Sequence, residues 1–297
     1  MKLLKFLLPA CLLFFAGCKE ENPLDIEQYE KSVYLVGANQ SNNEGLITVD
    51  VPFTESDDGE YETYVSVATG GSQNINKDIT VTLADAGEEV ISRYNFLYRY
   101  QDTVIKYQYL NTDYFSIPSY TTTIKAGEVY GNVPVYFKPN QLHCDSLYAI
   151  TLKIASVSDP DYIKIRSTDT TLMVALNLVN DYSGTYLETG AYYPVASASP
   201  SSSDTVSLTP SRTFTAVSYD EVRFYHLANT EGVLSTLDAL GVVVKINSDY
   251  SLTISPWGSL SITDGGGTYS PDTETFNIWY TYLVNGVAYK FEGTFVE

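Results

Sequence analysis

Apolar and polar positions alternate along most of the chain, and this pattern predicts β-strands. In the run 45–53, Ile47, Val49 and Val51 fall on one side and mostly polar residues on the other. Because successive side chains of a strand point to opposite faces, a period of two indicates a half-buried strand. Further runs of this kind are 32–37, 61–68, 79–83, 121–125, 133–137, 147–156, 172–178, 242–246, 252–254, 275–284 and 287–296.

One segment, 85–97, has helical spacing instead. Its apolar positions share one helical face, and two acids stand in its first turn, where the helix dipole favours negative charge. The apolar positions are Val90, Ile91, Tyr94 and Leu97, and the acids are Glu88 and Glu89. The sequence therefore predicts one short helix within a chain of strands.

Two stretches beyond the helix carry unusual compositions. In the tyrosine-rich stretch 98–114, alternation predicts a ribbon that turns at Asp102-Thr103, with Tyr98 and Tyr100 opposite Tyr107 and Tyr109. The triplet Gly265-Gly266-Gly267 leads into a strand rather than a helix. It is therefore interpreted as a turn and not as a phosphate-binding loop.

The polar stretch 180–183 divides these elements into two groups. Many short strands with closely spaced turn signals predict an all-β fold of two tandem β-sandwich domains. We expect an Ig-like β-sandwich with the short helix over 32–180, and a second β-sandwich or β-barrel-like domain over 181–297. A chain of this length also exceeds the usual size of one domain.

The N-terminus has the features of an export signal. Lys2 and Lys5 precede the apolar run 6–16, which is too short to cross a bilayer comfortably. Phe15-Ala16-Gly17-Cys18 resembles the lipobox of bacterial lipoproteins, which implies a signal peptide over 1–17 and a lipid on Cys18. Two acyl chains would anchor the protein without a membrane-spanning helix. The alternative is an ordinary cleaved signal followed by an incidental cysteine.

The residues after Cys18 suggest where the protein is displayed. Residues 18–31 are polar and are expected to form a tether. Lys19-Glu20-Glu21 looks like the surface-export signal of Bacteroidetes lipoproteins. This resemblance implies the outer face of the outer membrane, with the periplasmic face as the alternative.

The charge balance excludes one class of partner. Without residues 1–17 the chain holds 15 basic against 36 acidic residues, a formal net charge of −21. Such a surface repels phosphates, so no nucleic acid partner is expected. Cys144 is the one cysteine besides Cys18 in that part of the chain. With Cys18 lipidated no disulfide forms, and we expect Cys144 to be a small buried apolar side chain.

The last two strand runs form a hairpin whose register can be derived. Asn285-Gly286 between alternating runs is a strong two-residue turn signal. Counting outward from it gives an apolar face, expected in the core, of Val284–Val287, Tyr282–Tyr289, Tyr280–Phe291, Ile278–Gly293 and Phe276–Phe295. The opposite face carries Leu283–Ala288, Thr281–Lys290, Trp279–Glu292 and Asn277–Thr294.

That register predicts that Trp279 points away from the core. An outward indole can stack on a sugar ring while Lys290, Glu292 and Thr281 bond its hydroxyl groups. The alternative is that a loop or the other domain covers the indole. Trp257, in a turn within Ser255-Pro256-Trp257-Gly258, is a second candidate contact, or else a lid over the core.

Signatures of catalysis and of cofactors are lacking. His143 and His226 have no partners at ligand spacing, and no nucleophile elbow or phosphate loop occurs. The acidic clusters 57–60 and 159–161 lack a complete calcium loop, so solvated turns are expected. We therefore predict no catalytic residue, no metal and no cofactor, although two suitably spaced carboxylates would suffice for a glycosidase.

Several motifs resemble an uncharacterised family of two-domain Bacteroidetes surface lipoproteins. In the first half they are Tyr29-Glu-Lys-Ser-Val-Tyr-Leu35, Tyr94-Asn95, Thr123-Ile-Lys-Ala-Gly127, Val133-Pro-Val-Tyr-Phe137 and Tyr148-Ala-Ile-Thr-Leu152. In the second half they are Leu252-Thr-Ile254, Gly265-Gly-Gly-Thr-Tyr269 and Tyr280-Thr-Tyr-Leu-Val-Asn-Gly286. The resemblance implies an Ig-like or Calx-β-like first domain. It also implies a role beside SusC-like transporters and SusD-like binders in polysaccharide utilisation.

The leading hypothesis is a non-enzymatic surface lipoprotein that binds glycan through exposed aromatic side chains. Trp279 and Trp257 are the candidate contacts, with Lys290, Glu292 and Thr281 beside Trp279. The first alternative is an adhesin or scaffold subunit that packs against other outer-membrane proteins. The second is a glycoside hydrolase.

Overall fold

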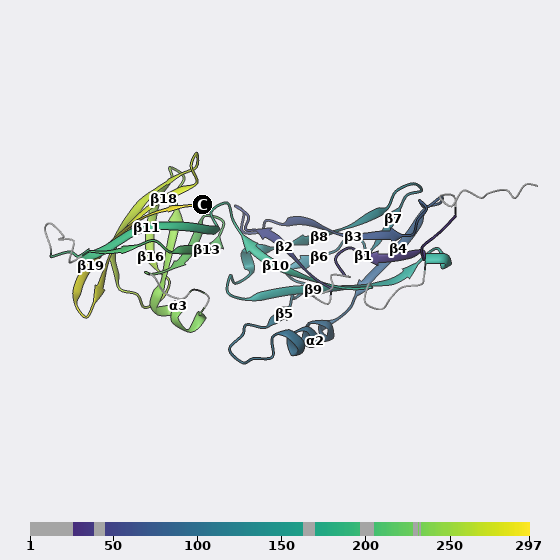
Figure 1. The fold of residues 1–297 in the computed structure, drawn as a ribbon, viewed down its shortest axis with the longest axis horizontal. Helices are drawn as coiled ribbons and strands as arrows, with labels where there is room; N and C mark the ends of the chain where they lie inside the picture. Colours follow the sequence, from purple (N-terminus) through teal and green to yellow (C-terminus); the bar gives the residue numbers. More distant parts are fainter. Residues whose placement is uncertain (1–25, 39–44, 163–169, 197–204, 228–230, 232) are drawn as a thin grey trace, which may run out of the picture.

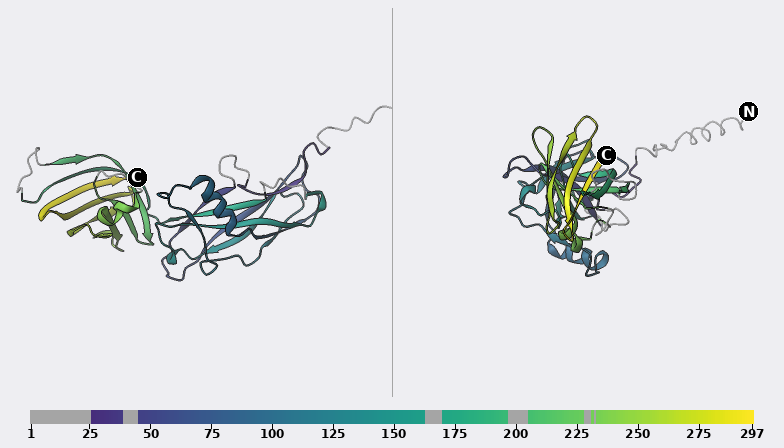
Figure 2. Two further views of the ribbon diagram at one scale, coloured as in Figure 1. Left: turned by 90° about the horizontal axis from the view of Figure 1, so that it is seen from below. Right: turned by 90° about the vertical axis from the view of Figure 1, so that its left-hand side faces the viewer.

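The protein is built from strands, arranged as two domains placed end to end (Figures 1 and 2). A computed structural model describes residues 26–38, 45–162, 170–196, 205–227, 231 and 233–297. The predicted signal peptide and Cys18 lie outside these residues. The prediction of an all-β fold with two domains is confirmed. No helix in the described ranges is both long enough and apolar enough to cross a bilayer.

The first domain packs a four-stranded sheet against a six-stranded sheet. The smaller sheet has the order β1 (Ser32–Leu35), β3 (Tyr61–Gly70), β8 (Tyr130–Phe137) and β6 (Phe115–Ser116). The larger has the order β2 (Leu46–Pro52), β10 (Thr171–Val179), β9 (Leu147–Val157), β4 (Ile79–Asp85) and β7 (Thr121–Ile124), with β5 (Tyr107–Tyr109) beside β9. Strands β2 and β5 run parallel to β10 and β9, respectively, and the other pairs are antiparallel.

Alternation along β10 explains how this sheet is buried on both faces. Leu172, Val174 and Leu176 enter the core between the two sheets. Met173 and Ala175 point to the opposite face, where they pack beneath helix α2 (Glu88–Tyr98). Figure 2 shows this helix lying across the outside of the sandwich. The predicted helix is therefore confirmed.

The second domain is a closed antiparallel sheet. Its strands follow one another around the sheet as β11 (Gly184–Pro194), β13 (Ser211–Ser218), β14 (Glu221–Tyr225), β15 (Gly241–Ile246), β16 (Ser251–Pro256), β17 (Ile262–Ser270), β18 (Thr275–Val284) and β19 (Val287–Val296). β19 pairs back onto β11, and the short β12 (Val206–Leu208) also pairs with β11. Of the two forms expected for this domain, the structure shows the barrel. Helix α3 (Leu234–Leu240), which the sequence did not predict, connects β14 to β15.

Two local predictions are wrong. The residues around Tyr98 and Tyr100 do not pair with Tyr107 and Tyr109: α2 ends at Tyr98, and β5 instead pairs with β9. The triplet Gly265-Gly266-Gly267 is not a turn, since it lies within β17 and pairs with β18. Its glycines allow close approach, because a Cβ on Gly265 would lie 2.9 Å from Cβ of Ile254.

The two domains also contact each other through a buried ion pair. Arg223 of β14 points out of the barrel and donates two hydrogen bonds to Asp145, which precedes β9. The Arg223 side chain is only 4% exposed. Asn180, between the domains, donates to the carbonyl oxygens of Ser218 and Glu221. These contacts hold the first domain against the barrel.

Candidate functional site

The terminal hairpin has the register derived from the sequence. All five apolar pairs occur in the expected register, from Val284–Val287 to Phe276–Phe295. Val284 and Val287 were expected in the core, but they flank the turn at the tip of the hairpin and are exposed. Asn285 and Gly286 both adopt positive φ, as a tight hairpin turn requires. Phe276, Tyr280 and Phe295 are buried in the barrel core. Trp279 therefore lies on the outer face of the barrel, where its side chain is half-buried.

The strands beside the hairpin complete a row of side chains across this outer face. Trp279 pairs with Glu292 of β19 on one side and with Gly266 of β17 on the other. A Cβ on Gly266 would lie 3.5 Å from the indole, so the indole lies over this glycine. Beyond Glu292 the row continues to Ala191 of β11.

An open groove of about 530 Å³ lies between Trp279 and Glu292 of this row and the neighbouring row Thr268–Asn277–Thr294–Thr189; we call it the outer groove. Its polar and aromatic side chains are Thr189, Thr268, Asn277, Trp279, Glu292 and Thr294. Thr294 donates to the amide oxygen of Asn277 at 2.9 Å. Within the described part of the chain, the amide nitrogen of Asn277 has no hydrogen-bond partner. The groove thus offers a flat aromatic surface together with hydroxyl, amide and carboxylate groups.

Two of the predicted site residues form an ion pair beside the indole. The Lys290 ammonium lies 2.6 Å from Glu292 and 5.4 Å from the Trp279 ring centroid. The Lys290 hydrogen bond is the main cause that lowers the pKa of Glu292, and the same bond raises the pKa of Lys290. Tyr193 also donates to Glu292, at 2.9 Å. Both members of the pair are therefore charged at neutral pH, and Glu292 is held in place.

The structure brings Trp279, Lys290, Glu292 and Thr281 together and places Trp257 elsewhere. Thr281 pairs with Lys290 across the hairpin. Trp257 follows β16 and is half-buried at the contact between the domains. The Arg223 guanidinium lies 4.4 Å from its ring centroid, and His143 of the first domain meets it edge to face. Sequence reasoning did not select Thr189 or Thr268. Thr189 reaches the groove only through the pairing of β11 with β19 that closes the barrel, whereas Thr268 lies on β17, where the glycine triplet was interpreted as a turn.

A buried charged cluster occupies the barrel interior. Glu188 and Arg212, each 1% exposed, form an ion pair of 2.7 Å. One oxygen of Glu188 and one terminal nitrogen of Arg212 have no hydrogen-bond partner. Burial raises the pKa of Glu188, although Arg212 opposes this shift. Nearby, Nδ1 of His226 lies 2.8 Å from the Tyr280 hydroxyl, and burial lowers the pKa of His226 to about 4.

Groups that could bind a metal ion are already engaged with basic residues. In the described ranges, His143, Cys144 and Asp145 place ligand atoms within 4.8 Å of one another. Arg223 pairs with Asp145 and also donates to Cys144, so its charge would repel a cation there. Cys144 is accordingly a half-buried junction residue and not a core side chain. Asp159, expected in a solvated turn, is 5% exposed and bonded to Lys77.

Fold and groove together define a tandem all-β protein, a sandwich followed by a closed barrel with an aromatic groove on its outer face. A family model for an N-terminal domain matches residues 29–161, and one for a C-terminal domain matches residues 170–296. The chain belongs to the uncharacterised two-domain Bacteroidetes family that these models describe. No curated protein matches the chain.

Solved Bacteroides structures have the same two-domain fold. A protein of unknown function from Bacteroides ovatus is 16% identical, with a TM-score of 0.63 over 90% of this chain and 94% of that chain. A multidomain protein including DUF1735 from the same species is 15% identical, with a TM-score of 0.62 over 91% and 94%. An auxiliary nutrient binding protein from Bacteroides thetaiotaomicron is 16% identical, with a TM-score of 0.58 over 88% and 92%. At these identities the likeness establishes the fold alone.

Proposed function

We propose that the protein binds glycan in the outer groove, with Trp279 as the stacking surface. The observation that carries this proposal is an outward indole in a groove of about 530 Å³ among hydroxyl, amide and carboxylate groups. A sugar ring presents an apolar face and a rim of hydroxyls, which matches that set of contacts. A structurally similar Bacteroides protein is described as an auxiliary nutrient binding protein, which agrees with the proposal.

The strength of one such contact can be estimated from area. A sugar face covering about 80 Å² of indole, at about 25 cal/mol per Å², contributes about 2 kcal/mol, or about 30-fold in Kd. This gives modest affinity at a single groove. Display of many copies on a membrane would raise the effective affinity through multivalent contact.

Trp279→Ala tests the proposal directly. The chain from residue 19 onward keeps every described residue and can be titrated calorimetrically against a panel of plant and host glycans. We expect the variant to bind about 30-fold more weakly, because the stacking surface is lost. Tyr130→Ala is the matched control, since Tyr130 is an exposed aromatic residue, 55% accessible, on the first domain. Equal affinity of wild type and the Trp279 variant for every bound glycan would refute the assignment.

A fluorescence measurement locates binding independently. The chain has two tryptophans, so Trp257→Phe leaves Trp279 as the only indole. Phenylalanine keeps an aromatic ring against Arg223. A glycan in the outer groove should then change the emission of this variant. Binding detected by calorimetry without any change in emission would place the ligand elsewhere.

The remaining parts of the proposal concern location and partners. We propose attachment to the outer membrane through a lipid on Cys18, exposure at the cell surface, and action beside SusC-like and SusD-like proteins, as a binding protein without catalytic activity. Replacement of Cys18 by Ala should release the protein from membranes. Co-purification from native membranes tests the partners and the alternative scaffold role. Release of products from labelled glycans would contradict the non-enzymatic assignment.

A further inference from the structure

A second hollow, of about 590 Å³, lies where the two domains meet; we call it the junction cleft. The first domain contributes the segment after β2, with Glu55 and Asp57, and Asn140 of the short helix η2 (Pro139–Gln141). The barrel contributes Tyr219 between β13 and β14 and Tyr250 between β15 and β16. Its volume lies in the usual range of ligand sites, which often form between domains.

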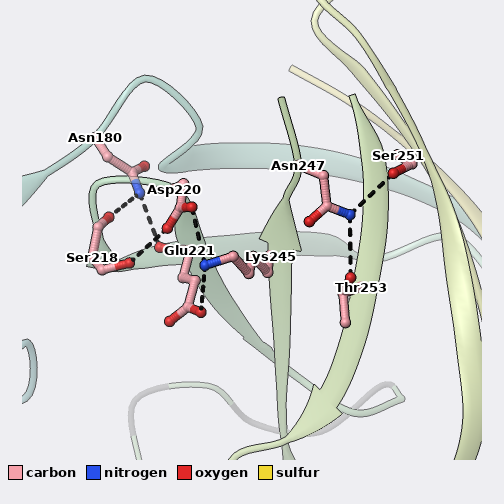
Figure 3. A network of polar contacts seen from close by, with 8 residues as sticks. All are labelled: Asn180, Ser218, Asp220, Glu221, Lys245, Asn247, Ser251 and Thr253. Carbon is pink, nitrogen blue, oxygen red and sulfur yellow. Dashed lines mark hydrogen bonds and ion pairs between the residues drawn. The ribbon is translucent and has the colours of Figure 1, made fainter. Parts of the chain in front are cut away.

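Both walls of the junction cleft are held by hydrogen bonds. Asn140 accepts from the backbone N–H of Thr54 at 2.9 Å and donates to the carbonyl oxygens of Thr54 and Ser56. On the barrel wall, Asn180 donates to the Ser218 carbonyl at 2.7 Å (Figure 3). The Arg223–Asp145 ion pair joins the domains nearby. A cleft shaped before binding loses little conformational entropy when a ligand enters.

The barrel wall also presents two exposed aromatic rings. The side chain of Tyr219 is 43% exposed and that of Tyr250 is 44% exposed. Other tyrosines of the barrel, such as Tyr280, are buried in its core. Tyr250 adopts a φ of +62°, which non-glycine residues rarely take. The turn is held by a hydrogen bond from the Asn247 amide to the Ser251 hydroxyl (Figure 3) and by one from the Tyr250 backbone N–H to the Asn247 carbonyl. Both tyrosines line the cleft, and a tyrosine ring can contact the apolar face of a sugar ring.

The charges of the junction cleft decide which ligands fit. Glu55, Asp57 and Asp220 line it, and no basic residue is among its described lining residues. Lys245 is not a lining residue; it is partly exposed beside Asp220 and forms ion pairs with Asp220 at 3.1 Å and with Glu221 at 3.7 Å (Figure 3). The cleft therefore repels phosphorylated, sulfated and uronic ligands. Carboxylates accept hydrogen bonds from hydroxyl groups, so a neutral, hydroxyl-rich ligand is favoured.

We propose that the junction cleft is a second carbohydrate site, specific for neutral oligosaccharides, in which Tyr219 and Tyr250 contact the sugar rings and Glu55, Asp57 and Asp220 bond their hydroxyls. This site shares no residue with the outer groove. It therefore goes beyond the function proposed for Trp279, and either site can exist without the other.

The test uses the chain from residue 19 onward carrying Trp279→Ala, which removes the outer-groove indole. Calorimetric probes are the hexasaccharides of cellulose, starch, xylan and mannan, with hexagalacturonate as the anionic comparison. We expect at least one neutral hexasaccharide to bind and hexagalacturonate not to bind. Addition of Tyr219→Ser and Tyr250→Gly should weaken that binding about tenfold or more. Glycine suits the positive φ at position 250, and Tyr130→Ala again serves as the control.

The outcomes separate the two proposed sites. Binding that survives Trp279→Ala and is lost with the tyrosines supports the junction cleft. Binding that is lost with Trp279 and is indifferent to the tyrosines refutes the junction cleft and supports the outer groove. Preference for hexagalacturonate, or no binding of any neutral probe by the Trp279→Ala chain, also refutes it. Unchanged thermal unfolding of the tyrosine variant would show that the loss is not misfolding, as expected for two exposed rings.

Discussion

Asp145→Ala should reveal how strongly the two domains are coupled. Arg223 donates to both oxygens of Asp145, at 2.8 Å and 2.5 Å, and the two side chains are 4% and 14% exposed. Removing one partner of a buried ion pair leaves an uncompensated charge and costs about 3–5 kcal/mol. Here the guanidinium keeps its contact with the Trp257 ring, and water already reaches Asp145. We therefore expect the lower end of that range, about 3 kcal/mol of unfolding free energy.

A double-mutant cycle measures the pair itself. Arg223→Met retains most of the apolar stem, and it should cost less than Asp145→Ala because the carboxylate left behind is more exposed. The double variant should be less destabilised than the sum of the single variants, because the second change removes a charge that is already unpaired. Urea unfolding is suitable because urea, unlike a guanidinium salt, does not screen charges. It should be followed by tryptophan emission and circular dichroism. Additive losses, or a loss below about 0.5 kcal/mol for Asp145→Ala, would refute the reasoning.

Two further predictions concern the charges inside the barrel. The pKa of His226 falls from 6.5 to about 4 on folding, so between these pH values the unfolded chain binds a proton that the folded chain does not. Stability present above pH 6.5 is thus lost as the pH falls towards 4. The variant His226→Gln can still form a hydrogen bond with Tyr280 but does not titrate in this range, so it should lose about 3 kcal/mol less unfolding free energy between pH 6.5 and 4. Urea unfolding at several pH values measures this difference. An unfolding free energy that depends on pH equally in both proteins would contradict the prediction. Glu188→Ala should cost about 3 kcal/mol, the lower end of the range for a broken buried ion pair, because Arg212 then keeps its longer contact of 3.7 Å with Glu231. Glu188→Leu combined with Arg212→Met should recover most of that loss. A double variant as unstable as Glu188→Ala would disprove the second prediction.

The terminal hairpin was predictable because local chemistry determines its register. Asn285 and Gly286 tolerate the positive φ of the turn, and a one-residue slip would expose the whole apolar face. Once the turn is located, the outward position of Trp279 follows by counting. The contents of the outer groove do not follow, because Thr189 reaches it only through the pairing of β11 with β19.

The wrong predictions share a physical cause. The ribbon expected around Tyr107 and Tyr109 relied on local pairing, whereas these residues join β9 in parallel with a partner distant in sequence. The glycine triplet in β17 has the composition of a turn, yet it serves the close packing of Ile254 and Trp279 against the strand. Glycines occur both in turns and in strands against which a neighbouring side chain packs closely, so a glycine-rich composition alone does not distinguish the two.

Closure of the barrel also affects how the protein is made. β11 and β19 are neighbours in the barrel but lie roughly a hundred residues apart in the chain. At about 5–20 residues per second, the ribosome completes β19 about 5–20 seconds after β11. Until then β11 and β18 present unpaired edges that other chains can join. Every newly made copy therefore exposes these two edges until β19 pairs with β11, and a chain cut short before β19 would keep them exposed.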